Sequence, residues 1–333
     1  MTAPLVAVEG LSKRFTQAQD AAERLATRIG FGAPPGTVHA VDDVSFTVAP
    51  GEVVGLVGES GSGKSTIGRM IAGLIPPSDG VIRYDGKDIT RRSRAESRAA
   101  ALQIQMIFQD PMSSLNPRTR VRDIIAEAPL FHGLIRASEV PGFVDATLER
   151  VGLDPSVRDR YPHQFSGGQR QRIVIARALA VSPRFLICDE SVAALDVSIQ
   201  AQVLNLFMRL RRELGLSYLF ISHDLGVVEH ISDRVVILYL GRVVEVAPTE
   251  ALFAGALHPY TQALLAEVPR LSTEKRRFQP IKGEIPSPLA PPPGCHFHTR
   301  CPHAGPRCSR EVPRLKAEGP RAAACHLHDG GVA

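Results

Sequence analysis

The chain has 333 residues, of which 39 are basic and 34 acidic, and its net charge of +5 is too mild to mark a nucleic-acid-binding protein. It has no tryptophan and only 5% aromatic residues, so it offers few rings for stacking bases, and nucleic acid is not expected as a partner. No run of about 18 apolar residues could span a membrane and no secretory signal is recognisable, so the sequence predicts a cytoplasmic location.

The first predicted elements are strands and helices around a possible insertion. Residues 5–8 and 44–48 are rich in valine and predict strands. Residues 17–37, with a short amphipathic pattern and a loop rich in Gly and Pro, are interpreted as a surface insertion. Residues 53–57 form a continuous apolar run that predicts a buried parallel strand, and residues 65–71 predict the helix that follows it.

The segment that joins this strand to this helix fits the phosphate-binding pattern G-x-x-x-x-G-K-[ST], the P-loop. Its glycines let the backbone bend tightly, so several N–H groups can point at one phosphate chain. A strand before the loop and a helix after it are the context that such a site requires. The segment therefore predicts a nucleoside triphosphate site at Gly58, Ser60, Gly61, Ser62, Gly63, Lys64, Ser65 and Thr66.

Helical patterns and apolar runs continue to alternate up to about residue 250. Residues 92–101 predict an exposed helix, and residues 121–151 predict helices that break at Pro129, Gly133 and Pro141. Apolar strands are predicted at 104–108, 185–189, 218–222 and 235–240. This alternation predicts an α/β fold with a mainly parallel sheet and crossover helices.

Two adjacent carboxylates, Asp189 and Glu190, end one of these strands, at the sheet edge where ligands bind in open parallel sheets. Asp189 can hold Mg²⁺ together with the hydroxyl of Ser65. Glu190 can orient or deprotonate an attacking water. The alternative is an acidic strand end without a role.

A second glycine motif, Phe165-Ser166-Gly167-Gly168-Gln169, stands about twenty residues before these carboxylates and directly before a helical pattern. Glycine N–H groups and the positive end of a helix favour an anion, and Ser166 adds a hydroxyl. Alone, the motif would also suit an ordinary N-cap and turn.

Taken in order, these motifs resemble those of the ATP-binding cassette (ABC) ATPases over about residues 5–245, together with Gln109 after a strand, Ala194-Leu195-Asp196 and Ser222-His223-Asp224. The family signature reads Leu-Ser-Gly-Gly-Gln where this chain has Phe165. The resemblance implies a P-loop NTPase cassette: a RecA-like, mainly parallel sheet core, an antiparallel β subdomain, and a helical subdomain at about 110–165. It also implies ATP and Mg²⁺ as ligands.

The resemblance further implies a role for each motif. Lys64 would hold the β- and γ-phosphates, and Mg²⁺ would be organised by Ser65, Gln109 and Asp189. Glu190 would be the general base. The three residues after it, Ser-Val-Ala, differ from the Pro-Thr-Ser of many members but include no catalytic group of the family, so the site is expected to be competent.

The remaining motifs are implied to contact the γ-phosphate, to stack on adenine or to act across a subunit interface. His223 would contact the γ-phosphate, whereas Ser166 and Gly168 would reach the γ-phosphate held by a second ATPase subunit. Asp196 would link the two sites. Phe15 is the candidate for the ring that stacks on adenine, with an ordinary core phenylalanine as the alternative. Two subunits in head-to-tail pairing are thus expected to bury two ATP molecules.

Two segments, 109–118 and 258–265, are similar to those of the oligopeptide/dipeptide importer ATPases, and the Gln-Asp-Pro of the first is similar to the F-type partner. The resemblance implies a peripheral subunit at the cytoplasmic face of the inner membrane. Its expected partners are two transmembrane permease subunits, a related but distinct second ATPase and, indirectly, an extracytoplasmic substrate-binding protein. Peptide is the expected cargo, with nickel or another small solute as the alternative.

Two functions of other classes remain as alternatives to an importer ATPase. One is a soluble ABC ATPase in nucleic-acid maintenance, which the single cassette and the lack of a long coiled-coil pattern disfavour. The other is a nucleotide-binding regulatory module without turnover.

Residues 251–333 are expected to form a small C-terminal extension to a cassette at 1–250, with a Pro-rich linker at 286–293. Its cysteines, Cys295, Cys301, Cys308 and Cys325, are separated by 5, 6 and 16 residues, which fits no zinc finger. Four thiolates can bind zinc or a [4Fe–4S] cluster. The importer ATPases have a similar Gly-Cys-x-Phe-x-x-Arg-Cys-Pro segment, which in some members holds such a cluster. We therefore expect a [4Fe–4S] cluster, with zinc as the alternative and free thiols third.

Overall fold

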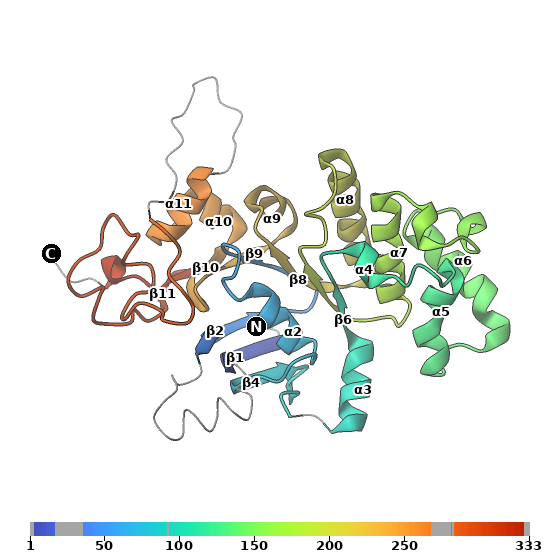
Figure 1. Cartoon of the computed structure of the whole chain (residues 1–333), viewed down its shortest axis with the longest axis horizontal. Coiled ribbons are helices and arrows are strands. Elements are labelled where there is room, and N and C mark those ends of the chain that lie inside the picture. The colour runs from blue at the N-terminus through green and yellow to red at the C-terminus, as the bar shows by residue number, and fades with distance from the viewer. Residues whose placement is uncertain (1–2, 17–35, 92, 268–280, 282, 330–333) are drawn as a thin grey trace, which may run out of the picture.

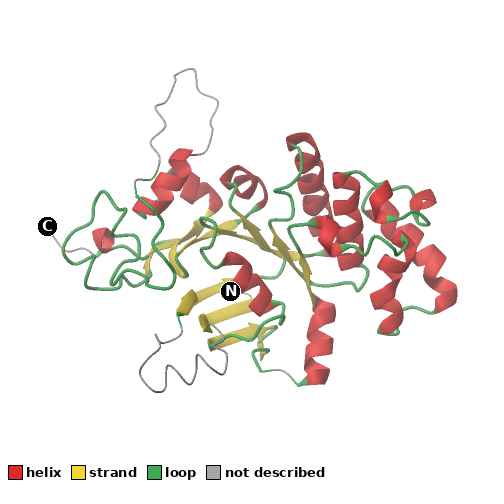
Figure 2. Cartoon of the chain, in the orientation of Figure 1, coloured by secondary structure: helices red, strands yellow, loops and turns green. Residues whose placement is uncertain are grey.

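The computed structural model consists of two β-sheets with helices packed around them (Figures 1 and 2). It describes residues 3–16, 36–91, 93–267, 281 and 283–329. The predicted insertion at 17–37 lies almost wholly outside the described residues. Within the described part of the chain, no helix is both long and apolar enough to cross a membrane.

The smaller sheet is antiparallel and has the strand order β2-β1-β4-β5. Its strands are β1 (Val6–Thr16), β2 (Thr37–Val48), β4 (Asp79–Tyr84) and β5 (Lys87–Asp88). The strands predicted at 5–8 and 44–48 are confirmed, but both are longer, because β1 and β2 stay paired out to Thr16 and Thr37. That outer part contains charged residues, so its sequence lacks a clear apolar alternation.

The larger sheet has the order β11-β12-β10-β9-β3-β8-β7-β6. Its five parallel strands are β3 (Val53–Val57), β6 (Ile104–Ile107), β7 (Phe185–Asp189), β8 (Ser217–Ser222) and β9 (Arg234–Tyr239). Their near-continuous apolar runs are buried on both faces, as parallel strands usually are. The predicted α/β class and mainly parallel core are confirmed.

The same sheet continues with three antiparallel strands that the sequence patterns did not signal. These are β10 (Arg242–Pro248), β12 (Arg321–Ala323) and β11 (Lys316–Glu318). β12 pairs with β10 at Glu245 and Val246, so the C-terminal extension adds strands to the sheet of the cassette.

Helices connect the parallel strands and cover the sheet (Figure 2). Those near the sheet are α2 (Lys64–Ile71), α3 (Arg94–Gln103), α8 (Val197–Leu214), α9 (Leu225–Ile231), α10 (Thr249–Ala254) and α11 (Pro259–Glu267). A second group lies between β6 and β7 in the chain and at the right of Figure 1, with α4 (Pro111–Ser114), α5 (Val121–Phe131), α6 (Val140–Arg150) and α7 (Gly167–Leu179). Short 3-10 turns occupy Ala137–Glu139, Pro155–Val157, Pro162–Gln164 and His326–His328.

Pro129 and Pro141, in the second group of helices, do not break a helix where the sequence predicts a break. Pro129 does not break α5 but lies buried near its C-terminal end, two residues before Phe131. Pro141 lies in the first turn of α6, where a missing N–H costs nothing. Gly133 does mark an end, with φ +67 just after α5.

The C-terminal extension also shares a core with the cassette. Phe297 is 1% exposed and packs its ring 5.2 Å from that of Tyr239 on β9 and 5.3 Å from that of Tyr260 on α11. Aromatic ring pairs at such centre-to-centre distances are favourable beyond the area that they bury. The segment after the Pro-rich linker is thus fixed against the strand next to β3.

Candidate active site

The P-loop spans the turn from β3, a fully buried strand inside the larger sheet, to α2. Gly63 has φ +102, and a Cβ there would lie 2.2 Å from the carbonyl oxygen of Ala40. Gly58 has no room either, since a Cβ would lie 2.1 Å from the oxygen of Leu238. The loop needs glycine at both positions, which fits the predicted close turn of backbone N–H groups.

Lys64 begins α2 and is only 4% exposed. Its Nζ donates to the carbonyl oxygens of Gly58 at 2.7 Å and Glu59 at 2.9 Å. Burial lowers the pKa of Lys64, and the neighbouring carboxylates oppose that shift. The ammonium group is therefore held against the loop whose N–H groups would cradle phosphate.

Ser65 and Asp189 meet although they are far apart in the sequence. The Oγ of Ser65 donates to Oδ1 of Asp189 at 2.7 Å. Burial raises the pKa of Asp189, and the hydrogen bond from Ser65 opposes that shift. A cation at this point would favour the charged carboxylate.

Glu190 follows β7 directly and has both carboxylate oxygens in contact with polar side chains. Nε2 of Gln109 donates to Oε2 at 2.9 Å, and Nδ1 of His223 lies 3.4 Å from Oε1. Glu190 has φ +48, a strained backbone conformation for a residue other than glycine, and such strain gathers at functional sites. Three predicted residues from different loops thus converge at one strand end.

An open cleft of about 560 Å³ adjoins this point, a volume in the usual range for ligand pockets. It is lined by Ser65, Arg69, Phe108, Gln109, Asp110, Ser113, Ser114, Arg177 and Asp189. The cleft therefore joins the P-loop side of the site to the loop that carries Gln109.

The signature motif is placed at a helix start, as predicted. Ser166 is the N-cap of α7, where its Oγ accepts from the N–H of Gln169 and its own N–H donates to Oε1 of Gln169. A Cβ on Gly168 would lie 2.4 Å from Ile199 of α8, so glycine is needed there for packing. Phe165, the departure from the family pattern, is 4% exposed and part of the core. Figure 1 places α7 among the helices at the right and α2 near the centre.

Asp196 and Phe15 lie at the surface. Asp196 precedes α8 and is exposed, and Val197 next to it is 82% exposed. Phe15 is 42% exposed on β1, with Nζ of Lys13 at 5.1 Å from its ring centre. An ordinary core role for Phe15 is therefore excluded.

The predicted metal centre in the C-terminal extension is wrong. Among residues 3–329, apart from the gaps given above, no group of three or more His, Cys, Asp or Glu side chains could hold a metal ion. Cys295, Cys301, Cys308 and Cys325 are free thiols. Burial raises the pKa of Cys295 to about 11.

The expectations of a [4Fe–4S] cluster and of zinc are both corrected by this finding. Sequence spacing shows how many sulfurs are near in the chain but not whether they converge on one point. The segment is better described by its packing than by its cysteines, because Phe297 fills a core and β12 extends the sheet.

Sequence reasoning also missed Glu59 of the P-loop and two residues that contact it. Glu59, one of the variable positions of the loop, is held by Arg300 of the C-terminal extension and by Tyr260 of α11. Both partners stand in segments that resemble those of the importer ATPases, at 258–265 and in the Gly-Cys-x-Phe-x-x-Arg-Cys-Pro segment. Their sequence pattern does not indicate a contact with Glu59, which lies more than two hundred residues earlier in the chain.

Comparison with known proteins agrees with this geometry. The ABC transporter family matches residues 41–193, and the family described as oligopeptide/dipeptide transporter, C-terminal region, matches residues 244–308. Oligopeptide transport ATP-binding protein AppF of Bacillus subtilis is 52% identical, covering 88% of this chain and 91% of its own. The OppF proteins of Salmonella typhimurium and Escherichia coli are each 50% identical, covering 89% of this chain and 90% of theirs.

Solved structures give the same result. The cbiO1 structure from Clostridium perfringens, part of the ABC transporter complex cbiONQ, has a TM-score of 0.61 and 28% identity, and covers 75% of this chain and 91% of its own. A dimeric post-hydrolysis structure of the ATP-binding cassette MJ0796, bound to ADP and Pi, has a TM-score of 0.62 and 25% identity, and covers 73% of this chain and 98% of its own. The chain belongs to the ABC transporter ATPases, among the ATP-binding proteins of oligopeptide/dipeptide transporters.

Proposed function

We propose that this chain is the ATP-binding and ATP-hydrolysing subunit of an ABC importer for di- or oligopeptides. The observation that carries the proposal is the network at the end of β7, where Ser65 bonds to Asp189 and Glu190 is held beside it. The relatives named as oligopeptide transport ATP-binding proteins support the cargo.

The donor set at this point suits Mg²⁺. A buried carboxylate and a hydroxyl are hard oxygen ligands, which Mg²⁺ prefers. Burial raises the pKa of Asp189, and a bound cation would oppose that shift. Asp189 and Ser65 would hold the ion, and the amide oxygen of Gln109 would reach it from the cleft. When bound, Mg²⁺ would neutralise developing charge on the phosphates.

The remaining residues bind phosphate and place water. Lys64 would move from the carbonyl oxygens of its own loop to the β- and γ-phosphates, and the N–H groups of 58–66 would surround them. Glu190 would take the proton of the attacking water, since Gln109 fixes its orientation. His223, whose side chain is 56% exposed, would contact the γ-phosphate.

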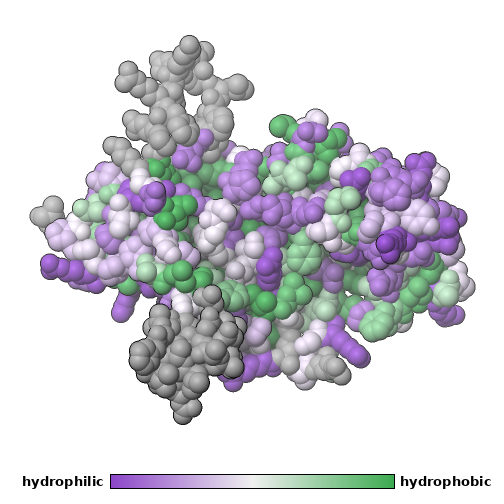
Figure 3. Space-filling view, in the orientation of Figure 1, coloured by the Kyte–Doolittle hydropathy of each residue, from purple (hydrophilic) through white to green (hydrophobic). Residues whose placement is uncertain are grey.

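The signature of this chain would serve a second ATPase subunit. Ser166 through Gln169 start a helix whose N–H groups and hydroxyl suit an anion, and they belong to a helix group set apart from α2 (Figure 1). The exposed Asp196 and Val197 would face that partner. Figure 3 shows hydrophobic residues over the region of α8. The dimeric form of the MJ0796 cassette supports this pairing.

The partners follow from this role. Two transmembrane permease subunits would carry the cargo, a related second ATPase would complete the nucleotide sites, and a substrate-binding protein would deliver peptide outside the cell. The chain would lie on the cytoplasmic face of the inner membrane. Phe15 would stack on adenine, which its exposure permits.

Peptide uptake in proteoliposomes tests the proposal. The wild-type chain, reconstituted with its permease subunits and binding protein, should import a labelled peptide only with ATP inside. The Lys64→Ala variant should assemble equally but import nothing. Co-purification with DNA instead of permeases would favour the rival function in nucleic-acid maintenance.

A further inference from the structure

We infer that the C-terminal extension holds the P-loop in its phosphate-cradling shape, through a clamp that Arg300 and Tyr260 form on Glu59. The inference rests on the proposed role of the P-loop in binding ATP. It assigns Arg300 and Tyr260 as positioning residues, because they act on the nucleotide site through Glu59.

The first half of the clamp is a two-pronged ion pair. Nη1 of Arg300 donates to Oε2 of Glu59 at 2.8 Å, and Nη2 donates to Oε1 at 3.0 Å. The side chains are 5% and 20% exposed, so the pair is largely shielded from water. Paired N–H groups on a carboxylate fix direction as well as distance.

The second half of the clamp acts on the backbone. The N–H of Glu59 donates to the hydroxyl of Tyr260 at 3.0 Å. Tyr260 is fully buried, and its ring lies 4.6 Å from that of Tyr239 and 5.3 Å from that of Phe297. The hydroxyl is therefore presented from a rigid aromatic core that the extension itself completes with Phe297.

Glu59 is part of the P-loop, so contacts that hold Glu59 also restrict its neighbours in the loop. Its carbonyl oxygen accepts from Nζ of Lys64 at 2.9 Å and from the N–H of Ser62 at 3.2 Å. The N–H, the carboxylate and the carbonyl of Glu59 thus all have partners. A shift of Glu59 would move the loop on which Lys64 rests.

A neighbouring contact supports the other side of the loop. Nδ1 of His296 donates to the carbonyl oxygen of Leu240 at 3.1 Å, and the next residue, Gly241, donates its N–H to the oxygen of Ser62 at 3.0 Å. Leu240 has φ +42, a strained conformation that such a bond helps to hold.

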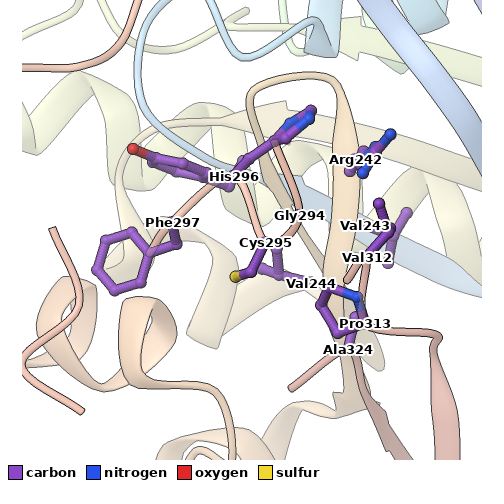
Figure 4. Close-up of a pocket in the computed structure, with 11 residues that line it drawn as sticks. Arg242, Val243, Val244, Gly294, Cys295, His296, Phe297, Val312, Pro313 and Ala324 are labelled. Carbon is purple, nitrogen blue, oxygen red and sulfur yellow. The ribbon is translucent and has the colours of Figure 1, made fainter. Parts of the chain in front are cut away.

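His296 and Arg300 lie in one short segment of the extension. Figure 4 shows Gly294 to Phe297 lying against Arg242, Val243 and Val244 of β10. The cavity between them is only about 30 Å³, room for a water but not for a substrate. The segment therefore supports the nucleotide site and does not form a separate ligand site there.

Such a clamp should affect affinity more than chemistry. A loop already held in its bound shape loses little freedom when ATP binds, whereas a released loop must be ordered at that moment. Arg300 and Glu59 touch none of Asp189, Glu190 and Gln109, which would act on the water. Cutting the clamp is thus expected to raise the KM for ATP and to leave kcat nearly unchanged.

The test compares Arg300→Gln, Glu59→Gln and the double variant in the full-length chain. Binding of a fluorescent ATP analogue with Mg²⁺ and the steady-state ATPase rate are measured. Each single variant should raise Kd and KM roughly tenfold, with kcat within about twofold of wild type. The double variant should bind ATP no more weakly than the single ones, because both substitutions remove the same contact.

Tyr260→Phe removes only the hydroxyl and should raise the KM for ATP by a smaller factor. This variant keeps the test valid if Arg300→Gln fails to fold.

A matched ion pair controls for lost stability. Glu52 and Arg234 form a similar pair, with Nε to Oε1 at 2.9 Å and side chains 17% and 24% exposed, at the opposite end of β3. Arg234→Gln should leave the KM for ATP unchanged. An unchanged KM in Arg300→Gln and Tyr260→Phe would overturn the clamp, as would an equal rise in Arg234→Gln or additive effects in the double variant.

A separate arm tests the function on which the clamp rests. Lys64→Ala should abolish detectable binding of the analogue. If Lys64→Ala bound it like wild type, the P-loop assignment itself would fail, whatever Arg300→Gln did.

Discussion

Glu190 combines backbone strain with fixed side-chain contacts. Its φ of +48 is tolerated because the N–H still donates to the oxygen of Ile221 and the carboxylate meets Gln109 and His223. A residue held so rigidly is suited to orient one water. The contact from Gln109 would then position the proposed base.

Gln109→Ala should therefore lower kcat by about tenfold, with a smaller change in the KM for ATP, since the base loses its orientation while the phosphate contacts remain. ATPase kinetics check this. Gln105→Ala is the control, because Gln105 lies on β6, the strand that leads to Gln109, but donates to the carbonyl oxygen of Ala101. Equal losses in both variants would contradict a specific role for Gln109.

A buried histidine gives the chain a pH dependence of stability. Burial lowers the pKa of His258 to about 3, and its Nδ1 accepts from the N–H of Tyr260. The unfolded chain takes up a proton near the ordinary pKa of about 6.5, and the folded chain does not. The contribution of His258 to the free energy of unfolding is therefore fully present above about pH 6.5 and is lost as the pH falls towards 3.

His258→Asn keeps an acceptor near this position but cannot titrate. The difference in unfolding free energy between wild type and His258→Asn measures the contribution of this group. As the pH is lowered from about 7.5 to 5, the free energy of wild type should fall by about 2 kcal/mol relative to that of His258→Asn. Urea unfolding at several pH values measures it. A constant difference over that range would show that His258 titrates normally in the fold.

Most residues of the candidate site could be predicted from local motifs. Lys64, Asp189 and Ser166 each stand in a pattern of glycines or apolar residues that fixes its strand or helix end. Arg300 could not be found in this way, because its role depends on pairing with Glu59 across the fold. The cysteines misled for the same reason: spacing along the chain does not reveal which side chains converge.

Among the elements, the start of α7 serves both stability and the proposed site. Ser166 and Gln169 form a capping box, and Ser93 and Glu96 form the same box at the start of α3. Each box satisfies two N–H groups that a helix start would leave free.

Ser166→Ala and Ser93→Ala should therefore destabilise the chain similarly, by about 0.5–2 kcal/mol each. Only Ser166→Ala should also lower ATP hydrolysis, since only α7 is proposed to meet a phosphate. Thermal unfolding and ATPase assays on both variants separate the two effects. Full activity in Ser166→Ala would assign Ser166 to helix capping alone.

The elements best predicted from sequence are the buried parallel strands. β7 was predicted with its observed bounds because an apolar run ends sharply at two carboxylates. β12 was not, because Arg321–Ala323 is too short and mixed to show a period, and it becomes a strand only by pairing with β10. Tertiary pairing, which local patterns do not contain, decides such elements.

At the scale of the whole molecule, the C-terminal extension is built into the cassette through Phe297, β12 and the contact with the P-loop. Removing the ring of Phe297 would leave a cavity beside Tyr239 and Tyr260. The extension is therefore expected to support both stability and nucleotide affinity.

Phe297→Ala should lower the unfolding free energy by about 3–5 kcal/mol, as expected for a fully buried phenylalanine. Denaturant unfolding measures the loss. Phe131→Ala, at a ring that is 76% exposed, should change it by no more than about 0.5 kcal/mol. A small effect of Phe297→Ala would mean that the extension packs only loosely.

The fold class of the whole molecule followed from alternating strands and helices and from the P-loop context. The proposed pairing of two chains depends on contacts between molecules, which the local patterns of one chain do not contain.

The proposal that Glu190 is the catalytic base is tested most directly by the ATPase rate of Glu190→Gln in the assembled transporter. The amide keeps the shape of the carboxylate and one accepting oxygen but takes up no proton, so kcat should fall at least about a hundredfold while ATP binding persists and holds the two ATPase subunits together. Steady ATP turnover at the wild-type rate would contradict this role.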